Sequence, residues 1–138
     1  MGLDEAGRGS IIGPLLIGGV VIEKSKLDQL SKIGVKDSKL LTPNNRNRLL
    51  KLIKNISKTV VTQKICPSEI DEYVSKGKKY RRLNYLEAIT MGQIALNQDP
   101  DIIYVDAADI NPKRFADDIR SILTKDVTIF SAHKADQK

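Results

Sequence analysis

The stretch that decides the fold reads Gly2-Leu3-Asp4-Glu5-Ala6-Gly7-Arg8-Gly9-Ser10, and Gly13-Pro14 follows shortly after it. Two adjacent carboxylates close a short apolar strand, and a glycine-arginine-glycine turn comes next. The apolar run Leu15–Ile22 then predicts a second strand, buried on both faces. Carboxylates at a strand end suit a divalent cation, and glycines beside an arginine let backbone N–H groups approach a phosphate or sugar. The stretch therefore predicts a metal site beside a nucleic-acid contact.

Composition narrows the class of protein. A chain of 138 residues predicts one domain with a real core. Its 23 Lys and Arg against 17 Asp and Glu favour a polyanionic partner such as nucleic acid. The single cysteine, Cys66, excludes an internal disulfide and favours a reducing compartment, the cytoplasm. No apolar run is long enough to span a membrane, and the early acids argue against a signal peptide.

The order of patterns predicts a mixed sheet with helices packed on it. The stretches that read as strands are Met1–Ala6, Leu15–Ile22, Thr59–Ile65, Ile102–Val105 and Val127–Phe130. Thr42 before Pro43 predicts a helix start, and Leu83–Asn97 is the longest helical pattern. The first two strands suggest a hairpin, whereas the strand, helix and strand from Val105 to Val127 imply a parallel crossover.

Acidic residues recur at the ends of three predicted strands. Asp4 and Glu5 close the first, Asp106 closes Ile102–Val105, and Asp136 follows Val127–Phe130. Carboxylates that converge repel one another unless cations lie between them, and oxygen ligands alone favour Mg²⁺ or Mn²⁺. Two such ions can activate water and stabilise the leaving oxygen of a phosphodiester. The alternative for any one of these acids is a turn former or a helix cap.

The neighbours of these acids have less specific interpretations. Both Asp4 and Glu5 can point the same way only if the strand ends or bulges there. His133 is interpreted as a supporting residue rather than a general base, and Asp109 as a turn residue. The basic run Lys76–Arg82, with tyrosines nearby, suits either nucleic-acid contact or a solvated loop. The Lys and Arg residues of the helix after Pro43 favour a solvated helix face.

Three motifs together resemble the ribonuclease HII family, the type 2 ribonucleases H, in an archaeal style. They are Asp4-Glu5-Ala6-Gly7-Arg8-Gly9 with Gly13-Pro14, Val35-Lys36-Asp37-Ser38-Lys39-Leu40, and Val105-Asp106-Ala107-Ala108-Asp109 with His133-Lys134-Ala135-Asp136. The resemblance spans the whole chain. It implies a ribonuclease H-like α/β fold over residues 1–138, with a five-stranded mixed sheet of three antiparallel then two parallel strands.

The resemblance also implies a function. It implies hydrolysis of the RNA strand of RNA/DNA hybrids, and cleavage of DNA at embedded ribonucleotides. The reaction would use two metal ions and give products with 5′-phosphate and 3′-hydroxyl ends. The residues that match the family's catalytic and metal-binding set are Asp4, Glu5, Asp106 and Asp136. Those that match its substrate contacts are Gly7, Arg8, Gly9 and Lys39, of which the turn would contact the ribose 2′-hydroxyl. We expect a monomer that does not bind membranes.

Two alternatives remain at this stage. The family continues well past the motif that contains Asp136, so we expect this chain to be a C-terminally truncated form that lacks the family's C-terminal region. The first alternative is therefore a non-catalytic fragment that still binds RNA/DNA hybrid. The second is another nuclease or strand transferase on the same fold.

Overall fold

A computed structural model describes residues 1–9, 12–75 and 82–132 of the chain. Two groups of residues singled out in the sequence lie largely or wholly outside these ranges. One is the basic run Lys76–Arg82, of which the backbone of Arg82 alone is described. The other is the segment from His133 to Asp136, so the predicted position of Asp136 stays a prediction.

The described strands form one five-stranded sheet. They are β1 (Gly2–Ala6), β2 (Leu15–Val21), β3 (Thr59–Ile65), β4 (Ile102–Asp106) and β5 (Thr128–Ala132). The strands lie in the order β3-β2-β1-β4-β5, with β1 parallel to β4 and β4 parallel to β5. The β3-β2-β1 half is antiparallel, which confirms the predicted mixed sheet.

Five α-helices connect these strands in the described part of the chain. They are α1 (Leu27–Lys32), α2 (Pro43–Ile56), α3 (Pro67–Ser75), α4 (Arg82–Gln98) and α5 (Pro112–Arg120). Two of them begin at a polar cap followed by proline, because the cap side chain accepts a free backbone N–H and proline lacks one. Thr42 caps α2 and Asn111 caps α5 in this way.

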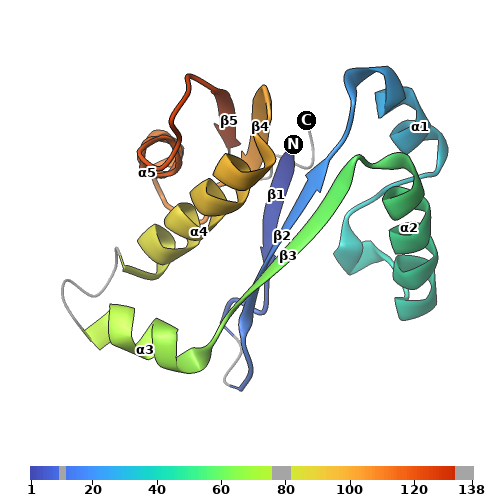
Figure 1. Ribbon diagram of the computed structural model, residues 1–138. Coiled ribbons are helices and arrows are strands. Elements are labelled where there is room, and N and C mark those ends of the chain that lie inside the picture. The colour runs from blue at the N-terminus through green and yellow to red at the C-terminus, as the bar shows by residue number, and fades with distance from the viewer. Residues whose placement is uncertain (10–11, 76–81, 133–138) are drawn as a thin grey trace. The chain divides into compact units, whose positions relative to one another are not determined.

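The chain divides into two compact units, residues 1–19 with 61–138 and residues 20–60. In the first unit, α4 and α5 lie side by side on one side of β1, β4 and β5 (Figure 1). Apolar side chains of this unit are almost fully buried, which the hydrophobic effect favours. They include Leu3, Ile103, Val105, Met91, Phe115 and Ile119. A Cβ at Gly92 would lie 2.9 Å from Cβ of Ile122, so α4 allows very close approach there.

The opposite face of β1, β4 and β5 is exposed, and we call it the open face. Side chains alternate along a strand, so Tyr104 lies on the face opposite to buried Ile103 and Val105. Tyr104 is paired in register with Phe130 on β5 and their rings stack, with centroids 5.0 Å apart. Both rings are about half exposed.

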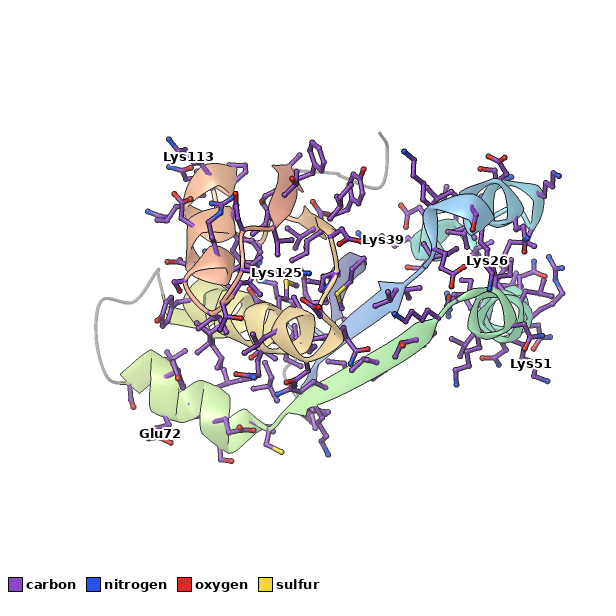
Figure 2. The ribbon with its side chains drawn as sticks, turned by 45° about the horizontal axis from the view of Figure 1, so that its top comes forward. Lys26, Lys39, Lys51, Glu72, Lys113 and Lys125 are labelled. Carbon is purple, nitrogen blue, oxygen red and sulfur yellow. The ribbon has the colours of Figure 1, made fainter. Side chains whose placement is uncertain are left out.

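The second unit, residues 20–60, carries α1, α2 and two short 3₁₀ turns, η1 (Lys24–Lys26) and η2 (Ser38–Leu40). The Arg46 guanidinium of α2 donates to the backbone oxygens of Ser38 (3.2 Å) and Leu41 (2.8 Å), which holds η2 against α2. Leu49 is the buried residue of α2. Lys51 is exposed on α2 (Figure 2), as expected for a solvated basic surface, whereas Lys26 of η1 is half-buried.

One expectation about the strands is wrong. The run from Leu15 was predicted to be buried on both faces, but burial alternates along the first half of β2. Leu15 and Ile17 are buried, whereas Leu16 between them is 36% exposed. A continuous apolar run is therefore not proof of two covered faces, because exposed leucines are common on folded proteins.

Candidate active site

Asp4 and Asp106 stand at the same level on adjacent parallel strands. Leu3 of β1 pairs with Val105 of β4, and each aspartate is the next residue along its strand. Because Gly2 pairs with Tyr104, strand alternation puts both aspartates on the open face. The topology thus brings together two acids that are 102 positions apart in the sequence, as the strand-end argument predicted.

Asp4 and Glu5 lie on opposite faces of β1, because the strand continues through Ala6 instead of ending at the acids. Asp4 is exposed and its carboxylate accepts the backbone N–H of Glu5 at 2.8 Å. Glu5 is half-buried on the side of α4. Within the described part of the chain, its Oε2 is buried with no hydrogen-bond partner. The two neighbouring acids therefore meet different surroundings.

The pKa of Glu5 responds to the other two acids. Burial raises the pKa of Glu5 above its ordinary value, and the negative charge of Asp4 raises it further. The Arg8 guanidinium opposes this shift, and Asp106 adds a smaller upward contribution to the pKa of Glu5. The Glu5 carboxylate is thus repelled by two other carboxylates, and a bound cation would relieve that repulsion.

The donor set fits a hard divalent cation in its chemistry. Asp4, Glu5 and Asp106 offer only carboxylate oxygens, the ligands that Mg²⁺ and Mn²⁺ prefer. As the side chains stand, no three of the Asp, Glu, His or Cys residues in the described ranges are arranged to hold an ion. The fourth predicted ligand, Asp136, lies outside those ranges, so the set described is three of the four predicted residues.

The turn after β1 requires its first glycine. Gly7 has φ of +89°, and a Cβ there would lie 2.8 Å from the backbone oxygen of Pro14. Gly9 has φ of +81°, but a Cβ there would meet no atom within 4 Å. Gly7 is thus needed for both conformation and space, and Gly9 for conformation alone. A side chain at Gly9 would therefore extend into open space beside the turn.

Arg8, in the middle of this turn, contacts neighbouring elements while its side chain stays 33% exposed. Its Nη1 donates to the backbone oxygen of Ala108 at 2.9 Å, and its Nη2 donates to Oδ1 of Asn84. Its Nε lies 3.4 Å from Oε1 of Glu87. These contacts join the turn to α4 and to the segment after β4.

Glu87 is the residue that sequence reasoning missed. It is 0% exposed on α4, between the buried Leu86 and Ala88. Burial raises the pKa of Glu87 to about 7, with Arg8 opposing the shift and Glu5 adding to it. The signal available in the sequence was a single glutamate among apolar or small residues of a helical segment. An acid in such a segment is almost never fully buried without a partner, so it points to an interaction.

Asp109 has the turn role that the sequence predicted, and it is buried as well, at 2% exposure. Its carboxylate accepts the backbone N–H of Asn111 at 2.9 Å and is held by the Arg114 guanidinium. Burial acts against the charged carboxylate, but these hydrogen bonds outweigh it and hold the pKa of Asp109 below its ordinary value.

Lys39 belongs to the second unit, where it is exposed in η2 (Figure 2). Its backbone N–H donates to Oδ1 of Asp37 at 2.9 Å, so Asp37 caps the turn that presents it. An exposed lysine on a capped turn suits a phosphate contact, which stays a prediction.

Across the described helices, none is long and apolar enough to cross a membrane.

Comparison with known proteins identifies the family. The family model described as Ribonuclease HII matches residues 1–138. A curated ribonuclease HII from Pyrococcus horikoshii is 44% identical over 140 residues, covering 99% of this chain and 60% of its own length. The chain therefore spans about 60% of the length of this curated relative.

Solved structures agree with these matches. The crystal structure of ribonuclease H2 from Pyrococcus horikoshii OT3 has a TM-score of 0.84 at 43% identity, covering 98% of this chain and 62% of that one. An Archaeoglobus fulgidus RNase HII, solved in complex with PCNA, also has a TM-score of 0.84, at 34% identity. It covers 99% of this chain and 62% of its own.

Proposed function

Because this chain belongs to the ribonuclease HII family, we propose that it cleaves the RNA strand of RNA/DNA hybrids and DNA at embedded ribonucleotides. The products are 5′-phosphate and 3′-hydroxyl ends. One observation carries the proposal: Asp4 and Asp106 stand level on adjacent strands, and Glu5, electrostatically linked to both, leads directly into the Gly7–Gly9 turn. An acidic centre beside a glycine turn suits phosphodiester hydrolysis.

The proposed ion site is made of Asp4, Glu5, Asp106 and Asp136. Mg²⁺ or Mn²⁺ bound there would supply the activation of water and the stabilisation of the leaving oxygen. Asp4 reaches the open face, where a substrate strand has access, whereas Glu5 reaches from the buried side. The raised pKa of Glu5 makes its deprotonation, and with it ion binding, more favourable at higher pH.

The chain's own contribution to substrate binding is the turn at Gly7, Arg8 and Gly9. The Arg8 guanidinium contacts Ala108, Asn84 and Glu87, so the turn offers a ribose or phosphate its backbone N–H groups beside a guanidinium that is already held. Positive φ at both glycines gives the turn a backbone conformation that residues with a Cβ rarely adopt. A contact with the 2′-hydroxyl at this turn would distinguish RNA from DNA. Lys39 would add a phosphate contact.

Three substrates of one sequence test the proposal. An RNA/DNA hybrid, a DNA duplex with one ribonucleotide and an all-DNA duplex are incubated with Mg²⁺ or Mn²⁺, and with chelator as the control. We expect cleavage of the first two alone, with 3′-hydroxyl ends that a polymerase extends. A salt-sensitive complex without cleavage would instead support the non-catalytic fragment, and equal cutting of all-DNA duplex would support another nuclease.

The proposal also includes a monomeric chain that works in the cytoplasm. Light scattering at several protein concentrations tests the first point, since a monomer keeps one mass throughout. Cell fractionation tests the second, and recovery with the membrane fraction would contradict it.

A further inference from the structure

The Arg8 guanidinium is held from three directions. Its two terminal nitrogens donate to the backbone oxygen of Ala108 and to the side chain of Asn84, and its Nε lies 3.4 Å from Glu87. Asn84 and Glu87 are three residues apart on α4, so both extend from the same helix face. An arginine in an exposed turn would otherwise sample many rotamers, because its side chain carries about 2 kcal/mol of conformational entropy.

Asn84 also influences Asp109. Its amide oxygen accepts from Arg8, and its side chain contributes, least among the causes, to holding the pKa of Asp109 below the ordinary value. Asp109 is held in turn by Arg114 and by the backbone N–H of Asn111. The turn after β1 is thus connected to the segment after β4 directly, through the bond from Arg8 to Ala108, which lies beside buried Asp109.

Glu87 supplies the third contact from a position with no access to water. Its side chain is 0% exposed, and among the described residues neither carboxyl oxygen has a hydrogen-bond partner. A buried carboxyl that keeps only one cationic neighbour is costly to retain. Its geometry makes sense if holding that neighbour serves the turn in which Arg8 lies.

We propose that Asn84 and Glu87 are positioning residues that hold the Arg8 guanidinium inward and thereby orient the backbone N–H groups of Gly7, Arg8 and Gly9 toward the substrate. The inference deepens the proposed function and rests on it. Neither residue touches the substrate; both act through Arg8. Their loss therefore weakens substrate binding more than it slows the chemical step.

The test measures KM and kcat on the RNA/DNA hybrid for the parent chain and six variants. Asn84→Leu and Glu87→Leu remove one contact each at similar side-chain size, and Arg8→Met removes all of them. Glu87→Gln keeps an oxygen acceptor for Arg8. The double variant Arg8→Met with Asn84→Leu closes a thermodynamic cycle. Thr90→Val is the matched control, since its buried hydroxyl donates to the Leu86 backbone oxygen of its own helix at 2.7 Å and to neither Arg8 nor the turn.

We expect Asn84→Leu and Glu87→Leu each to raise KM about tenfold with kcat changed less than about threefold. Glu87→Gln raises KM less than Glu87→Leu, and Thr90→Val leaves both constants at the parent values. The double variant has the KM of Arg8→Met alone, because Asn84 has nothing left to position. Circular dichroism and thermal unfolding verify that each variant is folded, and anisotropy with labelled hybrid gives affinity independently of turnover.

Multiplicative effects of Arg8→Met and Asn84→Leu on KM would overturn the inference, because they would show that Asn84 acts without Arg8. An unchanged KM in both leucine variants of a cleaving parent would also overturn it, while the proposed function would stand. A parent that neither binds nor cuts the hybrid would overturn the proposed function and this inference together.

Discussion

The two compact units differ sharply in charge. Residues 20–60 contain ten Lys or Arg against three Asp or Glu, whereas the rest of the chain contains 13 against 14. The described acids of the proposed ion site, Asp4, Glu5 and Asp106, all belong to the nearly neutral unit. The excess of positive charge therefore belongs to residues 20–60, whereas the proposed metal-binding carboxylates belong to the other unit. Substitutions in the first unit should therefore alter the reaction, and those in the second should alter attraction to a polyanion.

Asp4→Asn tests the division most strongly. We expect kcat on the hybrid to fall by about a thousandfold, the scale of removing one strong electrostatic contact to a transition state. Hybrid affinity should stay within about threefold, because the basic unit is unchanged. Single-turnover cleavage and anisotropy measure the two quantities separately, with Asp117→Asn on the exposed side of α5 as control. Appreciable residual cutting would remove Asp4 from the metal site.

Glu87→Gln tests the second-largest expected effect, which is on the pH dependence of the free energy of unfolding. The native carboxyl has a raised pKa of about 7 against 4.5 when unfolded, so the folded state binds the proton more tightly. The resulting stability is present below pH 4.5 and is lost as pH rises through 7, a difference of about 3 kcal/mol. Urea unfolding in chelator should show this loss in the parent and not in Glu87→Gln. A parallel fall in both would contradict the raised pKa.

A triple change on α2 tests the basic unit itself. Arg48, Lys51 and Lys54 are exposed, and replacing all three with Gln should weaken hybrid binding about tenfold at moderate salt, with a shallower salt dependence. The kcat at saturating hybrid should remain near the parent value. Lys113→Gln on α5 (Figure 2) is the matched control from the other unit. Unchanged affinity in the triple variant would leave α2 as a solvated face, the interpretation favoured from sequence.

Lys39→Gln is expected to have the smallest effect. One exposed phosphate contact should cost a few-fold in affinity and lower the salt slope by about 1, uniformly across hybrid sequences. Titration by anisotropy at several salt concentrations gives both values. A change in kcat at saturation would place Lys39 in the chemistry rather than in the attraction.

The strand and helix order could be predicted from sequence because its signals are local. Alternating and apolar runs, Thr42 before Pro43 and Asn111 before Pro112 mark element boundaries without knowledge of the tertiary fold. The meeting of Asp4 with Asp106 followed from one rule, that parallel neighbours end at the same edge.

The contacts of Arg8 could not be predicted in the same way. They join residues 76 to 100 positions apart, and no local pattern encodes which acceptor an arginine will reach. Glu87 was missed because helical spacing selects apolar residues as core and assigns an acid to the surface. Leu16 was misjudged for the converse reason, since an apolar residue does not have to be covered.

The opposite facing of Asp4 and Glu5 on β1 has a consequence for sequence change. Side chains on a strand repeat every two residues, so inserting or deleting one residue before Asp4 would exchange the two acids between the open face and α4. The same shift would move the Gly7–Gly9 turn away from its contacts with α4. A point substitution in β1 changes one side chain, whereas an insertion or deletion moves every side chain after it. We therefore expect β1 to tolerate substitutions far better than changes in its length.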